Sequence, residues 1–394
     1  MITGISNYIL PGLATALISL VLVLTKGFHG KHTSDPTEGI QKFHECHTPR
    51  IGGIAIFCGL IIACFLSTIP ETKLLKLMLI ASLPAFAAGV IEDLTKKAGV
   101  NRRLVATILS GTMAWWLTGY TLNHIDIQGI DILLSYLPIS LAFTVFAVAG
   151  ISNAANIIDG FNGLSSGTMM ICFSALGIIA WQVGDIDLLH TCLLLTLVTG
   201  GFFIINFPLG KIFLGDSGAY LLGFMLAWVA VMLPMRNPTV SAWAPFLICS
   251  YPFIETTYSM GRRVIKQSST SQPDIDHLHS LIKINVINRH FPNIPKHIRN
   301  SMVSPFCWII VIISATISVA YYKQTTLLIA ASICIFILYV IVYKILTRLN
   351  PSKEPALKEQ KICPLIAKDT TEPEYRYQKN QVIEESLMAE IHNN

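Results

Sequence analysis

A polar stretch at residues 153–164, with the sequence NAANIIDGFNGL, carries the side chains best suited to chemistry. Asn153, Asn156 and Asp159 are spaced by three, so on a helical turn they lean toward one side. The glycines in the stretch let a backbone come close to a ligand. Amides beside a carboxylate suit a hydrated cation or a polar nucleotide. A polar contact between helices at a helix stop is the alternative that this stretch alone leaves open.

The composition indicates a membrane protein. The chain has 394 residues, of which 53% are hydrophobic and only 13% are charged, about half the charged share of a soluble domain. Apolar runs recur that are long enough to cross a hydrocarbon core. We therefore predict an all-α polytopic membrane protein with about eleven transmembrane helices. These spans are expected at about 5–24, 51–68, 74–91, 104–120, 133–151, 164–182, 188–206, 217–233, 242–260, 303–322 and 326–346.

The basic residues predict how the chain lies in the membrane. With the N-terminus outside, the odd-numbered loops and the C-terminal tail hold 24 of the 28 Lys and Arg residues. The positive-inside rule therefore places these segments in the cytoplasm and the N-terminus in the periplasm. Residues 1–346 are expected to form the transmembrane domain, and 347–394 a flexible cytoplasmic tail with a short helix near 380–391. Since the basic residues lie beside spans, the net charge of +5 does not indicate a nucleic-acid partner.

Four other polar motifs fall on predicted cytoplasmic loops or at span ends on that face. Each has a simpler interpretation: solvated histidines for His44 and its neighbours, a solvated turn for Glu92-Asp93, and a helix cap for Asp216. Glu255 differs, because an acidic group inside an apolar stretch is costly and usually functional. The motifs are HTPRIGG at 47–53, GVIED at 89–93 with Arg102 beyond it, FLGDSG at 213–218, and the segment from Glu255 through Arg262 to His277 and His279.

All five motifs are predicted to lie on one face of the membrane. Simple helix stops would be spread over both faces, whereas loops gathered on one face can build a single site. Carboxylates, amides, histidines and arginines together suit a metal-bound pyrophosphate. The sequence therefore predicts an active site at the cytoplasmic face.

Taken together, the motifs resemble the polyprenyl-phosphate N-acetylhexosamine-1-phosphate transferase superfamily, of glycosyltransferase family 4 type, over about residues 35–300. The pattern of Pro252, Glu255 and Arg262-Arg263 resembles the branch that transfers N-acetylglucosamine or related sugars. The long His-rich signature of the phospho-MurNAc-pentapeptide branch is missing, which makes that enzyme the less favoured alternative. The chain departs from the family at Glu92 and Glu255, where relatives commonly have Asp, and at Ser280, where a further His is common.

The resemblance implies an enzyme of the bacterial inner membrane. A membrane-embedded acceptor, undecaprenyl phosphate, would attack the β-phosphorus of a UDP-sugar, release UMP and start a lipid-linked glycan of the cell envelope, such as O-antigen. The expected cofactor is Mg²⁺, with Mn²⁺ as the alternative. The sugar, the pathway and a homodimeric state stay open.

The resemblance also implies roles for particular residues. Asp216 would be both a catalytic residue and a metal ligand, and Asn156 would be the second ligand. Asp93 would hold or deprotonate the lipid phosphate, with Glu92 as its less certain neighbour. The remaining candidates are substrate-binding residues: His44, Arg102, Asn153, Asp159, Asn162, Glu255, Arg262, His277 and His279.

A secondary transporter of an anionic or lipid-linked substrate is the alternative from another class. Transporters place ionisable groups near the bilayer midplane on broken helices, within repeated halves. Here the predicted spans are almost free of charge at their centres, and the sequence shows no internal repeat. The enzyme is therefore the favoured interpretation.

Overall fold

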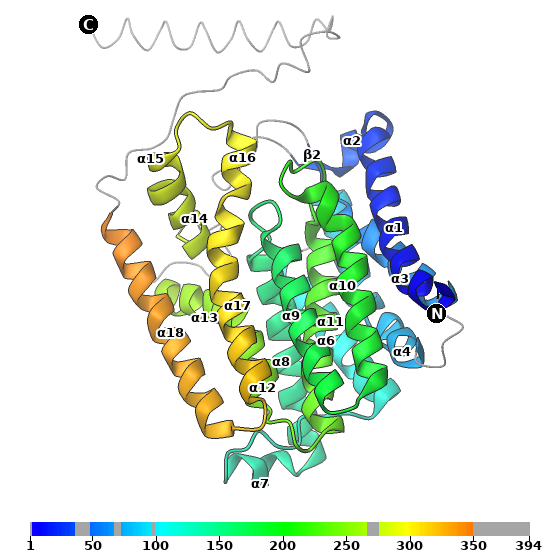
Figure 1. Cartoon of the computed structure of the whole chain (residues 1–394), viewed down its shortest axis with the longest axis vertical. Coiled ribbons are helices and arrows are strands. Elements are labelled where there is room, and N and C mark those ends of the chain that lie inside the picture. Colours follow the sequence, from blue (N-terminus) through cyan, green and yellow to red (C-terminus); the bar gives the residue numbers. More distant parts are fainter. Residues whose placement is uncertain (1, 36–47, 67–71, 97–98, 266–275, 350–394) are drawn as a thin grey trace, which may run out of the picture. The chain divides into compact units, whose positions relative to one another are not determined.

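A computed structural model describes residues 2–35, 48–66, 72–96, 99–265 and 276–349, and these residues are almost entirely helical (Figure 1). Within them, seven helices are long and apolar enough to cross a membrane. The predicted class, an all-α polytopic membrane protein, is confirmed. The seven are α1 (Ile2–Leu24), α8 (Leu137–Ile157), α9 (Leu164–Gln182), α10 (Ile186–Asn206), α11 (Gly215–Arg236), α17 (Val303–Tyr321) and α18 (Thr325–Arg348). The predicted tail covers 347–394, but Thr347 and Arg348 still belong to α18, and the rest of the tail from residue 350, with its short helix, lies outside the described residues.

Other apolar stretches form shorter or interrupted helices. An eighth crossing is made if α4 (Lys73–Ala81) and α5 (Leu83–Thr95), which meet at a bend of 49°, count as one broken span. The helix before them, α3 (Gly52–Leu66), is apolar but has only 15 residues. The next helix, α6 (Val100–Thr118), begins with the two arginines of its first turn.

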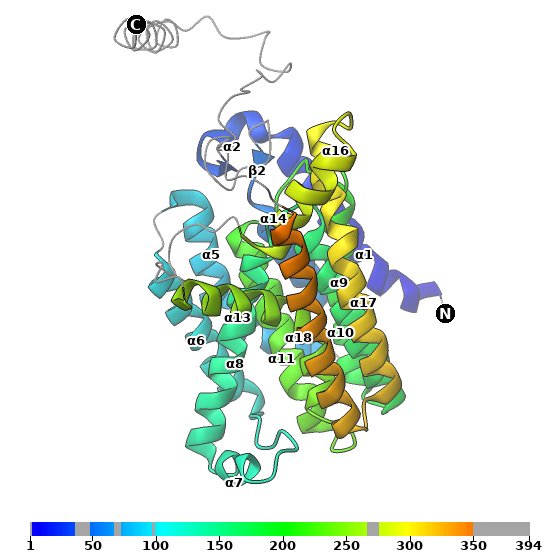
Figure 2. The ribbon, with the colours of Figure 1, turned by 90° about the vertical axis from the view of Figure 1, so that its left-hand side faces the viewer.

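The predicted span at 242–260 is divided. It forms α12 (Trp243–Ile248) and α13 (Ser250–Ile265), and α13 lies across the neighbouring helices (Figure 2). Pro252 stands in the first turn of α13, where its missing N–H costs nothing, but it could not continue a helix from α12. The polar residues of α13 also make it amphipathic, unlike a spanning helix. The expectation of one continuous helix here was wrong.

The long helices surround α11. This helix is buried along most of its length and packs against α3, α5, α8 and α9. Trp228 and Phe224 are fully buried within it. By contrast, α1 and α18 lie at the edge and expose apolar side chains, as helices facing lipid do. The position of Asp216 at the start of α11 is therefore fixed by the core of the bundle.

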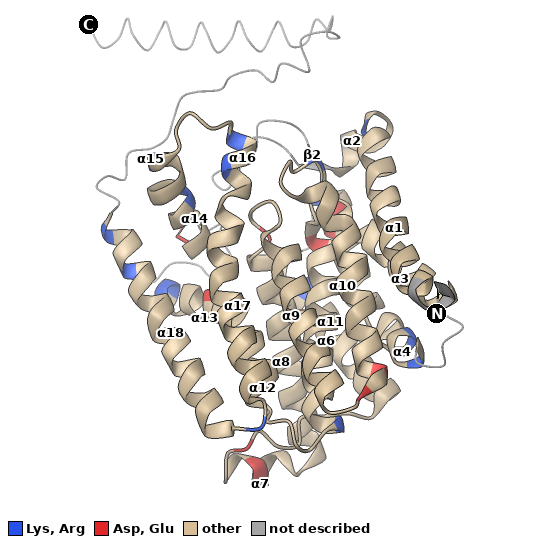
Figure 3. Ribbon diagram, viewed as in Figure 1, with Lys and Arg blue, Asp and Glu red and all other residues tan. Residues whose placement is uncertain are grey.

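Short elements complete the two ends of the bundle. The charged side chains lie mainly toward these ends, and α9, α10 and α17 are apolar along most of their length (Figure 3). The short elements are α2 (Lys26–Thr33), the antiparallel pair β1 (Ser34–Asp35) and β2 (Thr48–Pro49), α7 (Ile130–Leu134), α14 (Leu278–Ile282), the π-helix η2 (Lys283–Ile287), α15 (Asn288–His290) and α16 (Lys296–Ser301).

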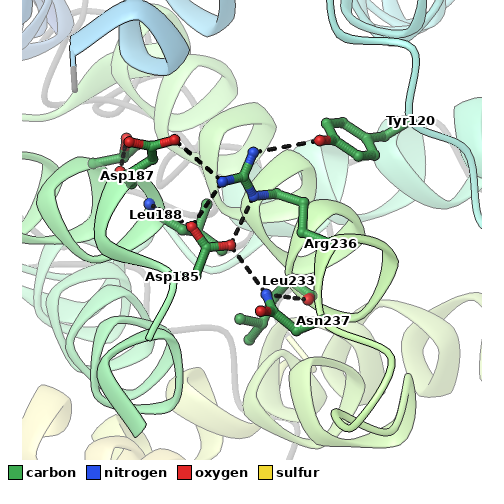
Figure 4. Close-up of polar contacts among 8 residues, drawn as sticks. Tyr120, Asp185, Asp187, Leu188, Leu233, Arg236 and Asn237 are labelled. Carbon is green, nitrogen blue, oxygen red and sulfur yellow. Dashed lines mark hydrogen bonds and ion pairs between the residues drawn. The ribbon is translucent and has the colours of Figure 1, made fainter. Parts of the chain in front are cut away.

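An ion-pair cluster ties α11 to its neighbours at the end opposite Asp216 (Figure 4). The Arg236 guanidinium makes two hydrogen bonds to the Asp185 carboxylate, at 2.7 and 2.8 Å, and a third, at 3.3 Å, to Asp187. It also donates to the Tyr120 hydroxyl. Asp185 in turn accepts from the Leu188 backbone N–H and so caps α10. The cluster joins the end of α11 to the α9–α10 connection.

Replacing Arg236 with Met should destabilise the protein, because the buried Asp185 carboxylate would lose the two hydrogen bonds that it accepts from the Arg236 guanidinium. We expect the free energy of unfolding to fall by about 2 kcal/mol, measured as a lower melting temperature in detergent. Lys323→Met is the matched control, because Lys323 is exposed near the same end. An equal melting temperature for Arg236→Met and the control would show that the cluster adds no stability.

Candidate active site

The structure joins three of the sequence motifs around the start of α11. Both oxygens of the Asp93 carboxylate, in the last turn of α5, accept backbone hydrogen bonds from the first turn of α11: Asp216 N–H at 2.8 Å and Ser217 N–H at 2.9 Å. Asp93 is 2% exposed. A carboxylate at a helix N-terminus satisfies two orphan donors and complements the helix dipole. Asp93 is therefore a cap supplied from another helix.

The HTPRIGG motif reaches the same place through its backbone. Gly52 N–H and Gly53 N–H donate to the carbonyls of Phe213 and Leu214, and Phe213 N–H donates to the Pro49 carbonyl. These bonds hold the beginning of α3 against the FLGDSG loop.

Two glycines in these motifs have no room for a side chain. A Cβ on Gly89 would lie 2.5 Å from the backbone of Ser217. Gly215 has a φ of +75°, and a Cβ on it would lie 2.4 Å from the Arg50 carbonyl oxygen. Both positions require glycine, for space or for the left-handed backbone. The close approach explains why glycines accompany the acidic residues in these motifs.

Two arginines neutralise the Asp216 carboxylate. Arg50 donates to one of its oxygens, and Arg103 donates to the other at 2.5 Å. Arg50 also lies 3.5 Å from the Asp93 carboxylate. Asp216 is 1% exposed, whereas the two arginine side chains are 26% and 19% exposed. The buried carboxylate is therefore covered by two cations that reach the open side of the site.

A single cavity of about 1520 Å³ connects these groups to the other motifs. Asp159 lines it close to Asp216, and burial, together with the carboxylates of Asp216 and Asp93, raises the pKa of Asp159 to about 7 against the opposing effect of Arg50. The polar lining residues include Arg50, Glu92, Arg103, Asn153, Asn156, Asp159, Asn162, Asp216, Tyr220, Arg263, His277, His279 and Asn300, with Ser259 and Ser280.

His277 and His279 line the cavity, and their rings are stacked. Their rings lie 5.2 Å apart and nearly parallel. Glu255 Oε1 accepts from the Leu278 backbone N–H at 3.1 Å and lies 2.9 Å from His277 Nδ1. A carboxylate on Nδ1 fixes the ring and leaves Nε2 for other partners. Glu255 thus contacts His277, and the segment from α13 to α14 is held together by that contact.

The remaining predicted residues fall into different settings. Asn153 and Asn156 line the cavity, and Asn153 accepts from the Tyr220 hydroxyl at 3.2 Å. Asn162 is 7% exposed and donates to Pro208 O and Ser301 Oγ, so its amide also joins the α10–α11 connection to the end of α16.

Four predicted residues, Asp93, Arg102, Glu255 and Arg262, are not among the residues that line the cavity. Arg102 is exposed, and its neighbour Arg103 makes the contact with Asp216. Arg262 is 2.8 Å from Asp276 and lies over the ring of Tyr343, while Arg263 lines the cavity. His44 lies outside the described residues.

Three further residues belong to the site although the sequence did not single them out. Arg50, Arg103 and Tyr220 contact Asp216, or one another, or the asparagines of the polar stretch. Each stood inside or next to a recognised motif, and helical periodicity within α6 separates Arg103 from Arg102. The sequence held no signal for the choice between these two adjacent arginines.

Comparison with known proteins agrees with the motifs. Residues 75–234 match the model of glycosyl transferase family 4. The chain is 28% identical over 251 residues to the undecaprenyl-phosphate alpha-N-acetylglucosaminyl 1-phosphate transferase of Yersinia pestis, a match covering 61% of this chain and 67% of the relative. It is 27% identical over 241 residues to a Bacillus subtilis protein described as a probable undecaprenyl-phosphate N-acetylglucosaminyl 1-phosphate transferase, covering 61% and 66%.

The name of a third relative specifies a different lipid, decaprenyl phosphate. The decaprenyl-phosphate N-acetylglucosaminephosphotransferase of Mycobacterium tuberculosis is 28% identical over 270 residues, covering 60% of this chain and 65% of the relative. The matches thus span about two thirds of the curated relatives. The chain is thus similar to polyprenyl-phosphate N-acetylglucosamine-1-phosphate transferases and, over residues 75–234, to glycosyl transferase family 4.

The capping geometry predicts that Asp93 matters more than Glu92. In Asp93→Asn the amide can accept one backbone hydrogen bond but places an NH₂ group against the other donor, so we expect a loss of about 2 kcal/mol in stability. Glu92 is half-buried beside it and makes neither bond to α11.

Glu92→Gln is the matched control and should lower the melting temperature much less. Thermal unfolding of both variants in detergent measures the difference. A larger loss for Glu92→Gln would contradict the assignment of Asp93 as the cap of α11.

Proposed function

We propose that this protein transfers a sugar-1-phosphate, N-acetylhexosamine-1-phosphate in particular, from a UDP-sugar to undecaprenyl phosphate. One observation is the main support for the proposal. The same cavity has a charged end and, continuous with it, a long apolar part. Its lining extends from Arg103 in the first turn of α6 to Leu122 and Ile125 beyond the end of that helix. A helix of this length rises about 28 Å, close to the thickness of a hydrocarbon core.

The apolar part of the cavity suits a lipid chain. Phe143 and Phe146 of α8 line it, yet Phe146 is 76% exposed, so the cavity opens sideways between helices toward the surrounding lipid. An acceptor with a polyprenyl tail could lie in this part and place its phosphate at the charged end. A soluble substrate alone would not need an apolar groove of this length.

The charged end suits the donor diphosphate. Arg50 and Arg103 come from separate segments of the chain and both contact Asp216 on the open side of the site. A guanidinium group can donate two parallel hydrogen bonds to two oxygens of one phosphate. His277 and His279 also line the cavity and offer ring N–H donors. The two arginines would offset the charge of two phosphate-bearing substrates brought together.

In the proposed reaction an oxygen of the acceptor phosphate forms a bond to the sugar-bearing phosphorus of the donor. The bond from that phosphorus to the bridging oxygen breaks, and UMP leaves with the bridging oxygen. A phosphate monoester has a second pKa of about 6, so most of the acceptor is already dianionic at neutral pH. The protein therefore has mainly to position the reactants and neutralise charge.

The residues present fit a Mg²⁺ ion. This ion takes one or two carboxylates and completes its shell with phosphate oxygens and water, and the cavity offers Asp216, Asp159 and the Asn156 amide as hard oxygen donors. Among the described residues, no group of three or more acidic, His or Cys side chains is arranged to hold a metal ion by itself, so substrate phosphates would complete the shell. A bound Mg²⁺ would supply charge neutralisation at the diphosphate.

The particular sugar and the face of the membrane are finer parts of the proposal. N-acetylglucosamine is favoured by the names of the relatives, and the cytoplasmic face by the distribution of Lys and Arg in the loops. Incubation of the purified protein with a panel of labelled UDP-sugars, followed by extraction of the lipid phase, tests the sugar directly.

Asp216→Asn should reduce transfer by at least about 100-fold, because the amide can neither accept from two guanidinium groups nor neutralise a cation. The melting temperature shows whether the variant is still folded. Activity close to that of the unchanged protein at saturating Mg²⁺ would show that the Asp216 carboxylate is not needed for the reaction.

With undecaprenyl phosphate present in detergent, the protein should also exchange label between UMP and the UDP-sugar, because transfer to the lipid and back replaces one phosphoanhydride with another at little change in free energy. Chelation of divalent cations should stop the exchange. A transporter would show no activity without a sealed compartment, so failure to exchange label and to form polyprenyl-diphospho-sugar across the panel of UDP-N-acetylhexosamines would refute the proposed function.

A further inference from the structure

A second group of cations lies in η2 and α16, in the segment that follows His279. Lys283 is 3% exposed, and among the described residues its ammonium has no hydrogen-bond partner. The Arg299 Nε is likewise buried and without a partner in the described part of the chain, although its Nη1 donates to Asn288 at 3.3 Å. Buried donors that carry charge are costly to leave unsatisfied.

These two cations are close neighbours. Burial, followed by the charges of Arg299 and Lys296, lowers the pKa of Lys283 to about 7. The helix α16, which carries both of these residues, packs against η2, which begins at Lys283. Positive groups brought together, with two donors unpaired, favour an anion between them.

The group also lies next to the cavity. Lys283 follows His279 by four residues and Ser280 by three, and such spacings place residues on the same side of a helix. His279, Ser280 and Asn300, the residue after Arg299, all line the cavity. A π-helical turn begins at Lys283, and such turns occur often at functional sites.

We propose that Lys283 and Arg299 form an additional phosphate-binding subsite at the edge of the cavity. Its ligand is a phosphate group of one of the two substrates, either the donor diphosphate or the acceptor lipid phosphate. This proposal rests on the proposed function for the choice of ligand, and on the two unpaired buried donors for the existence of the subsite.

The test measures anion binding and kinetics separately. The binding measurement follows the melting temperature of the detergent-solubilised protein as inorganic pyrophosphate is added. Lys283→Met and Arg299→Gln should weaken the apparent affinity for pyrophosphate about tenfold or more, as expected when a charge-assisted hydrogen bond is lost. Lys283→Met should not lower the melting temperature without ligand, because it removes a buried, unpaired cation. Lys323→Met is the control and should bind pyrophosphate normally.

The kinetic measurement then identifies which substrate supplies the phosphate. A higher KM for the UDP-sugar alone assigns the subsite to the donor, and a higher KM for undecaprenyl phosphate alone assigns it to the acceptor. Unchanged pyrophosphate affinity in both variants, with both KM values unchanged, would overturn the proposal. If the unchanged protein shows no transfer, the proposed function fails, but the pyrophosphate measurement still decides whether the subsite exists.

Discussion

The site depends on one interaction above the others, the capping of α11 by a carboxylate from α5. Asp93 accepts two backbone N–H groups of the first turn of α11, including that of Asp216 itself. Those donors would otherwise be unsatisfied in a buried, low-dielectric setting. The cap fixes the direction of the Asp216 side chain, and the glycine at 215 lets the surrounding backbones close around it. The two acidic residues therefore form one structural unit, although 123 positions separate them in the chain.

The cavity has a charged part and an apolar part. Its charged end is built from loop residues and helix ends, and its apolar length is built from α6, α8 and the residues around α12. Residues from both parts of the divided span at 242–260 line this cavity, Trp243 and Phe246 from α12 and Phe253 from α13. Glu255 lies in α13, and its contact with the His277 ring holds that ring at the cavity wall. The two short helices of the divided span thus contribute apolar lining residues to the cavity and, through Glu255, a contact to the histidine at its charged part.

Charge is placed differently at the two ends of α11. At one end, Asp216 meets two partly exposed arginines, and Asp159 stands nearby in the same cavity. At the other, Arg236 is saturated by Asp185, Asp187 and Tyr120. This cluster is suited to stability, because each of the three guanidinium nitrogens of Arg236 already has an acceptor. The open end retains cations facing a cavity, as binding of phosphate requires. The same types of residue make a stabilising cluster in one place and line the proposed binding cavity in the other.

The sequence alone determined the membrane class and the set of motifs, because hydropathy and local residue spacing are written in consecutive residues. The uncharged runs of α9, α10 and α11 could not be anything but buried or lipid-facing, and Asp159, Asp216, His277 and His279 stood out beside them.

Only the tertiary structure decided how these residues work together. It made Asp93 a helix cap, chose Arg103 over Arg102, added Arg50 and Tyr220, and divided the predicted span at 242–260. Each of these outcomes depends on contacts between residues far apart in the chain, or on how two helices pack. Such contacts are set by the balance of burial and hydrogen bonding in the whole bundle, which no local pattern records.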